Sequence, residues 1–289
     1  WRSVDFVDID SNTGLISIEK LKVKLKKAET LGKLPKIFIP VHFAGQPCDM
    51  KEIYTLGKKY GFKIVEDAAH AIGAKYKGSY VGNCLYSDIT VFSFHPVKII
   101  TTGEGGASLT NNPKLASRMR LLRSHGITRD KKEMLNPSDN SWYYEQIDLG
   151  YNYRMTDIHA ALGLSQLLRL DEYVNRRIEI VKHYNKKLSF DKFFPLSQKN
   201  DRRSSWHLFV IRVAGEKKLR DDLITVLREN EIGVNLHYIP VYKHPFINQK
   251  TELEGAEAYY DSALTIPLFS NMSIDDVEYV SKIINKYFN

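Results

Sequence analysis

The stretch of residues 90–106, TVFSFHPVKIITTGEGG, constrains what this chain can fold into more than any other. It begins inside a predicted buried strand, residues 89–94, where apolar and β-branched residues run almost without a break. The strand pattern ends at Pro96, Lys98 follows, and a glycine-rich turn closes the stretch at residues 103–106. Partial burial lowers the pKa of an amine and exposes the lone pair that a Schiff base needs, so Lys98 is a candidate for covalent chemistry. Taken alone, a solvated loop lysine is the commoner explanation, and the rest of the chain has to decide.

The composition predicts a soluble, cytoplasmic protein without a nucleic-acid partner, a membrane partner or a metal site. Of the 289 residues, 43% are apolar and 26% charged, and no apolar run approaches the roughly 18 residues of a membrane helix. The net charge of +8 would suit a phosphorylated small molecule as well as nucleic acid, but no nucleic-acid-binding motif is present. Two cysteines give no disulfide framework and fit a reducing compartment.

Alternating strands and helices predict an α/β fold with a mainly parallel central sheet. Residues 36–43 and 62–66 have the pattern of buried strands. Between them, residues 49–60 are predicted to form a helix that starts with a capping box from Asp49 to Glu52 and ends at Gly61. Strand, helix and strand at this spacing form a βαβ unit, in which the two strands are parallel.

The remaining elements predict a large domain followed by a small one. We expect a strand at 4–9, a helix at 17–31, a strand at 107–110, a helix at 113–123, a polar surface loop at 126–146 and a helical tract at 156–188. Beyond it we expect a loop at 197–205, a strand at 206–213, a helix at 217–229, an irregular stretch at 233–246 and a helix at 274–288. The predicted division is a large domain of residues 1–188, with its N-terminal part missing from this chain, and a small α+β domain of residues 189–289.

Three side chains that carry chemistry follow neighbouring predicted strands. Asp67 ends the strand at 62–66, Ser93 lies at the end of the next one, and Lys98 follows five residues later. Ligands of parallel sheets bind beyond the carboxyl ends of the strands, so we expect these groups at one edge. Asp67 could equally cap a helix, bind a metal or pair with a cationic ring nitrogen, and His70 alone is more often a packed histidine than a catalytic one.

A pyridoxal phosphate enzyme needs this set of groups. A carboxylate keeps the pyridine nitrogen protonated, and a lysine binds the aldehyde and later moves a proton. Hydroxyls and backbone amides hold the phosphate.

Several motifs resemble the DegT/StrS-type sugar aminotransferases, which are fold-type I pyridoxal phosphate enzymes with a small C-terminal domain. They are EDAAH (66–70), FSFHPVK (92–98) with ITTGEGG (100–106), and LGYNYRMTDIHAALGLSQL (149–167), in the family's order and spacing. HPVK and GVNLHYIPVYKHP (233–245) resemble the branch that aminates UDP-linked 4-keto-6-deoxy-N-acetylhexosamines, as in pseudaminic acid and surface glycan biosynthesis. The resemblance implies a ping-pong transfer from glutamate to carbon four of the sugar.

The resemblance also implies roles for individual residues. Lys98 would bind the cofactor aldehyde, Asp67 would pair with the pyridine nitrogen, and His70 would lie beside the ring near its phenolic oxygen. Ser93 would bind the cofactor phosphate or line the substrate site. Asn152 would reach the phosphate and substrate of the neighbouring subunit, which implies a homodimer with shared active sites.

The stretch that follows the predicted helix at 217–229 would border the nucleotide sugar, through His237, Tyr238, Ile239 and Pro240. Tyr153 is more simply a packed aromatic, and Arg154, which could form an interface salt bridge, is left out of the catalytic set. Family members also carry a longer N-terminal region with a Gly/Ala/Ser-Thr phosphate-binding turn, which this sequence does not contain.

Three other functions stay open at this point. One is amination of a different nucleotide sugar, of the 4-amino-arabinose or perosamine type. Another is the sugar 3-dehydratase branch, where a histidine replaces the lysine and which Lys98 therefore disfavours. The third is a non-catalytic relative acting as a ligand sensor, for which loss of the lysine or the aspartate would be expected.

Overall fold

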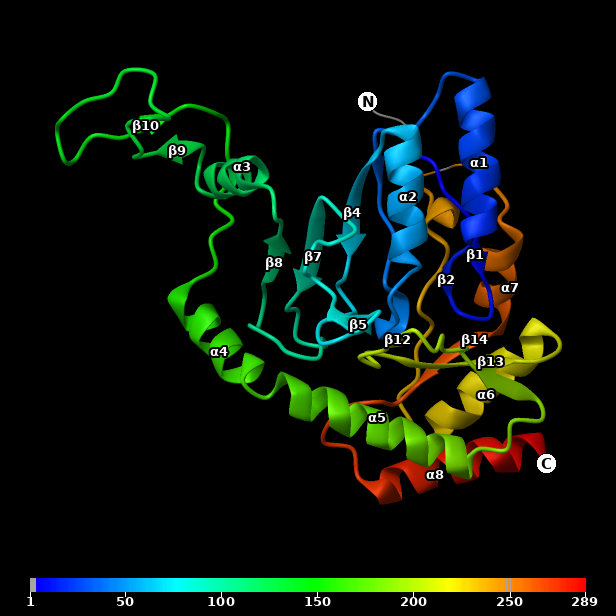
Figure 1. Ribbon diagram of the computed structural model, residues 1–289. Helices are drawn as coiled ribbons and strands as arrows, with labels where there is room; N and C mark the ends of the chain where they lie inside the picture. Colours follow the sequence, from blue (N-terminus) through cyan, green and yellow to red (C-terminus); the bar gives the residue numbers. More distant parts are fainter. Residues whose placement is uncertain (1–3, 248, 250) are drawn as a thin grey trace.

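A four-stranded sheet lies at the centre of the computed structural model, which describes residues 4–247, 249 and 251–289 (Figure 1). Three neighbouring strands are parallel and the fourth is antiparallel, in the order β3 (Ile37–Phe38), β4 (Lys63–Asp67), β7 (Ile89–Ser93) and β8 (Gly106–Leu109). The predicted βαβ unit is confirmed. The strand predicted at 36–43 is shorter than expected, because Pro40 has no N–H to donate to the ladder; pairing resumes only as a bridge from Val41 to Asp67.

Two helices cover one side of the sheet, α1 (Ile18–Thr30) and α2 (Met50–Tyr60) (Figure 1). Both were predicted within one residue at each end. They bury Leu21, Leu25 and Ile53 in a core that also contains Ile64 of β4. Apolar residues repeating at helical spacing thus meet the alternating buried positions of a strand.

The predicted capping box of α2 is wrong. The Asp49 side chain makes no hydrogen bond to the helix; its two oxygens accept hydrogen bonds from Lys199 at 2.6 Å and Arg202 at 2.7 Å. Charged donors outcompete the backbone amides for this carboxylate. The helix does end at Gly61 as predicted, with the left-handed φ of +79° that glycine adopts without strain.

The predicted strand at 4–9 is also wrong. Strand pairing starts only at β1 (Ile9–Asp10), which pairs with β2 (Leu15–Ile16). Asp8 explains the difference, because its buried carboxylate accepts the backbone N–H groups of Gly255 and Ala256. These are orphan donors at the start of α7 (Glu254–Ser262), so the segment before β1 is fixed by a helix end.

The predicted polar loop at 126–146 contains a short hairpin, β9 (Ile127–Thr128) with β10 (Glu145–Gln146), which the sequence did not indicate. It follows α3 (Pro113–Arg123), whose bounds were predicted, and it projects away from the rest of the molecule (Figure 1). Glu145 fixes the loop by accepting the backbone N–H groups of Leu135 and Asn136.

The predicted helical tract at 156–188 is two helices, α4 (Asp157–Leu167) and α5 (Leu170–Lys187). Thr156 caps α4 by accepting the N–H of His159. The helix α5 runs beneath the central sheet toward the C-terminal part of the chain (Figure 1).

The C-terminal residues build a second core on the far half of α5. Its three-stranded antiparallel sheet contains β11 (Phe193–Pro195), β13 (Phe209–Val213) and β14 (Ala263–Ile266). The helices α6 (Lys217–Glu229) and α8 (Ile274–Phe288), whose bounds were predicted, pack on it. β11, β14 and α7 were not predicted. Because Ile180 and Tyr184 of α5 belong to this core, residues on both sides of position 188 build it, and the domain boundary there stays a prediction.

The remaining elements are short. They are the strands β5 (Lys75–Tyr76), β6 (Ser79–Tyr80) and β12 (Arg202–Arg203), which form one small sheet, and the 3₁₀ turns η1 (Phe43–Gly45) and η2 (Val241–Lys243).

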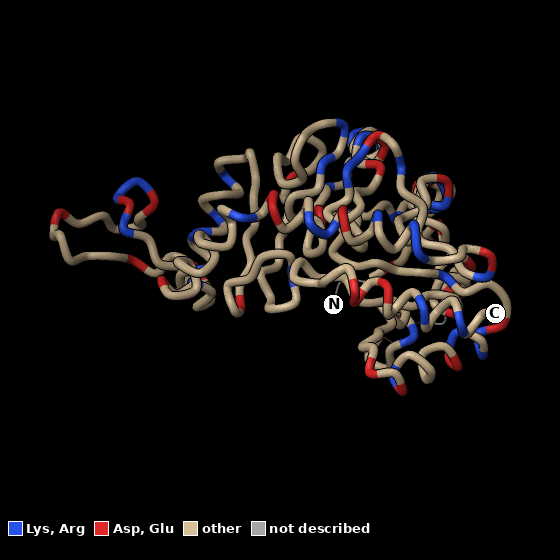
Figure 2. Tube along the Cα trace, turned by 90° about the horizontal axis from the view of Figure 1, so that it is seen from below, with Lys and Arg blue, Asp and Glu red and all other residues tan. Residues whose placement is uncertain are grey.

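Charged residues of both signs are interleaved along the trace (Figure 2). The net charge of +8 is therefore spread over the chain and is not concentrated in one stretch. In the part of the chain that the structure describes, no helix combines the length and the apolar character needed to cross a membrane.

Candidate active site

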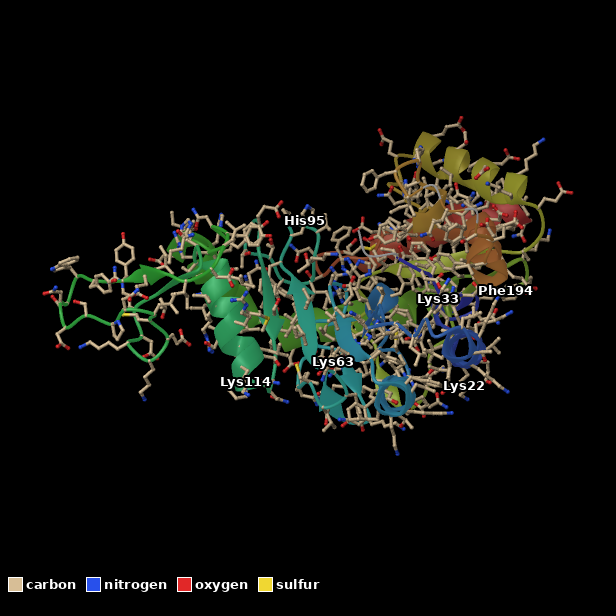
Figure 3. The ribbon with its side chains drawn as sticks, turned by 90° about the horizontal axis from the view of Figure 1, so that it is seen from above. Lys22, Lys33, Lys63, His95, Lys114 and Phe194 are labelled. Atoms are coloured by element: carbon tan, nitrogen blue, oxygen red, sulfur yellow. The ribbon has the colours of Figure 1, made fainter. Side chains whose placement is uncertain are left out.

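The carboxyl ends of β4 and β7 form the edge at which the candidate residues lie. The two strands are parallel neighbours, with Asp67 opposite Val91, and Ser93 is the last residue of β7. His95 marks this edge in Figure 3, and Lys63, at the start of β4, marks the opposite one. The loop after β7 then carries Lys98.

Hydrogen bonds to the backbone of Phe94 hold together the two ends of the loop that carries Lys98. Phe94 donates its N–H to Gly105 and accepts hydrogen bonds from the N–H of Thr102 and the hydroxyl of Thr101. Lys98 itself is half-buried, and burial lowers the pKa of its amine, while the carboxylate of Asp67 opposes that shift. The Lys98 amine therefore lies within electrostatic reach of Asp67 and is closer to its nucleophilic form than a surface lysine.

One carboxylate oxygen of Asp67 accepts no hydrogen bond from the residues that the structure describes. Oδ1 accepts the N–H of Ala69 at 3.0 Å, and no hydrogen bond reaches Oδ2 from the described residues. Residues 68–74 form successive turns in place of a helix, so the alternative that Asp67 caps a helix is wrong. An oriented carboxylate with a free oxygen at a sheet edge is suited to accept a hydrogen bond from a cationic ring nitrogen.

His70 is buried and neutral. Ala44 donates its N–H to Nδ1 at 3.3 Å, so Nδ1 carries no proton and the ring proton lies on Nε2. Burial, with the positive charges of Lys98 and His237, lowers the pKa of His70 to about 3. Nε2 lies 3.3 Å from the hydroxyl of Tyr238. At neutral pH His70 therefore offers an N–H donor next to Lys98.

The turn that orients His70 depends on Gly45, which gives a stability prediction. Gly45 has a φ of +98°, and a Cβ there would lie 2.7 Å from the Ser205 hydroxyl and 2.8 Å from the Trp206 nitrogen. We expect Gly45→Ala to lower the free energy of unfolding by about 3 kcal/mol, from backbone strain and overpacking together. Urea denaturation measures it. Gly61→Ala is the control, because its φ of +79° is similar but a Cβ meets no atom within 4 Å; there we expect about 1 kcal/mol. Equal losses in both variants would contradict the packing argument.

His70 also predicts a loss of stability in mild acid. Its pKa is about 3 in the folded protein against 6.5 in the unfolded chain, so only the unfolded chain takes up the proton between these values. The stability that depends on the neutral ring is complete above pH 6.5 and is lost as the pH falls toward about 3. We expect the free energy of unfolding to decline already between pH 6.5 and about 4.5, before carboxylates titrate. In His70→Gln, urea titrations should give a flatter decline; an unchanged slope would exclude His70 as a cause.

The structure brings part of the predicted 237–240 stretch to His70. Tyr238 contacts His70 through its hydroxyl, and Nδ1 of His237 lies 2.8 Å from the Thr265 hydroxyl of β14. Ile239, 44% exposed, and Pro240 continue the chain to η2 at the surface. The stretch therefore forms one wall beside His70, with an exposed continuation.

Asn152 does not join the other candidate residues within this chain. It lies on the exposed segment between β10 and α4, where it forms a bridge with Ser124 at the end of α3. Its neighbours Tyr151 and Tyr153 stack on each other with ring centroids 4.8 Å apart and are 55% and 71% exposed. Tyr153, predicted to be a packed aromatic, therefore packs against Tyr151 at the surface and not in the core.

Two buried basic side chains near His70 were missed by the sequence analysis. The ring of His207 lies 4.4 Å from that of His70, and Arg177 of α5 donates from one nitrogen to the backbone carbonyls of Trp206, His207 and Leu268. Nothing in the local pattern marks either one: His207 falls within a predicted strand and Arg177 within a predicted helix.

A cavity of about 650 Å³ adjoins the Lys98 loop on the side of α5. Its lining includes Lys98, Arg169 and Arg177, against one carboxylate, Glu172. The excess of positive charge favours an anionic ligand.

The residues present fit pyridoxal phosphate. The fit rests on the desolvated amine of Lys98, the free Oδ2 of Asp67 and the N–H at Nε2 of His70. These are the groups that would meet an aldehyde, a protonated pyridine nitrogen and a phenolic oxygen. Ser93 is the last residue of β7 at the same edge, and a serine hydroxyl can donate to a phosphate.

Known proteins are similar to this chain over nearly its whole length. Residues 2–285 match the DegT/DnrJ/EryC1/StrS aminotransferase family. The UDP-4-amino-4,6-dideoxy-N-acetyl-beta-L-altrosamine transaminase of Campylobacter jejuni is 38% identical over 283 residues, which cover 96% of this chain and 71% of that protein.

Solved structures have the same fold. Helicobacter pylori PseC, an aminotransferase involved in the biosynthesis of pseudoaminic acid, superposes with a TM-score of 0.88 at 28% identity, covering 99% of this chain and 74% of that one. Spr1654 from Streptococcus pneumoniae, assigned as a sugar aminotransferase and solved in PMP- and PLP-forms, gives a TM-score of 0.86 at 30% identity, covering 99% and 76%. The predicted fold-type I architecture is thereby confirmed, and the chain belongs to the DegT/DnrJ/EryC1/StrS family of aminotransferases.

Proposed function

We propose that this protein transfers an amino group, with pyridoxal phosphate as cofactor, from L-glutamate to carbon four of a UDP-linked 4-keto-6-deoxy-N-acetylhexosamine. The observation that carries the proposal is that Asp67 ends β4 and the Lys98 loop follows the neighbouring parallel strand β7, in a chain of this family. The electrostatic effects of Asp67 on Lys98 and of Lys98 on His70 support it. When bound, the cofactor supplies an electron sink for removal of the substrate α-proton.

Each residue then has a separate task. Lys98 would hold the cofactor through its amine and move the proton between carbon atoms, which its lowered pKa favours at neutral pH. Oδ2 of Asp67 would accept a hydrogen bond from the pyridine nitrogen, and its charge would keep that nitrogen protonated. His70 would donate from Nε2 to the phenolic oxygen, and Ser93 would donate to the phosphate.

The similarity to the Campylobacter jejuni transaminase supports the substrate class. The positive lining of the cavity beside Lys98 supports an anionic ligand such as a nucleoside diphosphate sugar. His237, Tyr238, Ile239 and Pro240 are proposed to border the sugar, because Tyr238 already contacts His70. Amination of another nucleotide 4-ketosugar is the alternative, since none of these observations distinguishes hexose configurations.

We further propose a homodimer in which Asn152 reaches the active site of the partner subunit. Its exposure on the segment before α4 supports this. The following helix and the residue that ends it expose apolar side chains that water disfavours, Ile158 at 81%, Leu164 at 67% and, at the C-cap, Leu168 at 89%. The two cysteines are free, which supports the proposed cytoplasmic location.

A panel of UDP- and TDP-linked 4-ketosugars tests the proposal. With glutamate and pyridoxal phosphate, mass spectrometry should detect the amine product for the UDP-linked N-acetylhexosamine and little or none for 4-keto-arabinose or perosamine precursors. A product from a TDP sugar alone would replace the proposed substrate with the alternative. No amine product from any sugar, in protein that binds the cofactor, would overturn the proposed substrate class.

A further inference from the structure

His207 lies against His70 although the two are far apart in sequence. Their ring centroids are 4.4 Å apart and the rings are inclined by 50°. His207 is only 6% exposed, and its Nδ1 has no hydrogen-bond partner among the described residues. A buried polar atom without a partner costs about 1–3 kcal/mol, so the His207 side chain lowers the stability of the fold.

The backbone around His207 is tied to the same turn that fixes His70. Ser205 donates its N–H to the carbonyl of Gly45 and its hydroxyl to the carbonyl of His70, and Leu208 donates to the carbonyl of Ala44. Ala44 in turn donates to Nδ1 of His70. The two histidines and the turn therefore form one unit. Arg177 of α5 adds to it by donating a hydrogen bond to the His207 carbonyl.

The basic groups that face the pair disfavour a positive charge on it. Lys98 faces both rings from the loop after β7, His237 faces them from the stretch before η2, and Arg177 acts on His207 from α5. Tyr238 contributes a neutral hydroxyl and Phe43 an apolar ring 5.9 Å from His70. Burial together with these charges lowers the pKa of His207 to about 2. A proton on Nδ1 of His70 would also oppose the Ala44 N–H.

We propose that His207 is a positioning residue: its ring holds His70 in the orientation and tautomer that present an N–H at Nε2. This inference rests on the proposed function for its purpose, because there that N–H would donate to the phenolic oxygen of the cofactor. Without the ring of His207, His70 could turn away from Ala44, and water could reach it. The neutral Nε2–H form would then no longer be enforced.

The test compares His207→Ala with His207→Phe in cofactor-free protein carrying ¹⁵N-labelled histidine. Long-range ¹H–¹⁵N spectra report the tautomer and the protonation of His70, which is assigned with His70→Gln. Wild type and His207→Phe should keep the neutral Nε2–H form from pH 8 to about pH 5, because phenylalanine preserves the flat ring. In His207→Ala the midpoint of the His70 titration should rise by at least about 2 pH units. If the alanine variant does not fold, His207→Val leaves a smaller void and carries the same expectation.

Two results would overturn the inference. One is a His70 titration in the alanine or valine variant that equals the wild-type titration. The other is loss of the Nε2–H form in His207→Phe as well, since the ring itself would then not be responsible. Because the spectra need no cofactor, failure of this inference is distinct from failure of the proposed function. In protein that does bind pyridoxal phosphate, the pH dependence of the cofactor absorbance should change in His207→Ala and not in His207→Phe.

Discussion

Lys98→Ala is expected to abolish both cofactor colour and turnover. Purified wild type with pyridoxal phosphate should absorb in a band at about 400–430 nm, from the conjugated link between the lysine and the cofactor. Alanine has no amine to form that link, so the band should disappear. Turnover should fall by about 10⁴-fold, the upper range for a positioned proton carrier, since Lys98 has two tasks.

The control is Lys114→Ala, which removes an exposed lysine at the start of α3 (Figure 3). It changes the net charge equally and should leave the band and the rate intact. Transamination retained by Lys98→Ala would show that another residue is the nucleophile. A wild-type protein that stays colourless with added cofactor would favour the non-catalytic sensor and end the enzyme proposal.

Asp67→Asn is expected to have the second largest effect. Asparagine keeps an oxygen that can accept the Ala69 N–H, so the local turn survives and only the charge is lost. Without a carboxylate the pyridine nitrogen is not held protonated, and turnover should fall by about 10²–10³-fold, as for loss of one preorganised electrostatic contact. Steady-state rates with glutamate and the UDP-sugar measure this.

The same variant changes Lys98 in a direction that can be checked without the cofactor. The charge of Asp67 raises the pKa of the Lys98 amine against the effect of burial, so removing that charge should lower the pKa further. Competitive acetylation of Lys98 as a function of pH should show reactivity beginning at lower pH in Asp67→Asn. Asp139→Asn removes a fully exposed carboxylate of the β9–β10 loop. It should change neither the turnover nor the pH profile of Lys98 acetylation. An unchanged Lys98 profile in Asp67→Asn would mean that the two groups do not interact.

The parts of the fold that were predicted correctly have local causes. Both α3 and α8 have local start signals: Asn112 caps α3 with proline in its first turn, and Ser273 opens a capping box at α8. The strands β4 and β7 were found because each is a short run of apolar and β-branched residues. Since both are parallel, their order alone placed Asp67, Ser93 and Lys98 at one edge.

The parts that were missed depend on partners distant in sequence. β14 is a fully buried four-residue strand whose pairing with β13 joins residues more than 50 positions apart. Asp49 had the sequence of a helix cap, yet its carboxylate is bound by Lys199 and Arg202. Neither the strand pairing nor the ion pairs of Asp49 can be recognised from the residues next to them in the sequence.

The sequence by itself determines the order of the strands, the loop that carries Lys98 and the position of Asp67 at a strand end. The reason is that backbone periodicity and chain direction are local properties. The tertiary structure alone decided the state of His70. Its tautomer comes from Ala44, and its neutral state comes first from burial and then from Lys98 and His237. The second imidazole beside it comes from His207, 137 positions along the chain from it. Burial and electrostatic fields are sums over neighbours in space, and only folding brings those neighbours together.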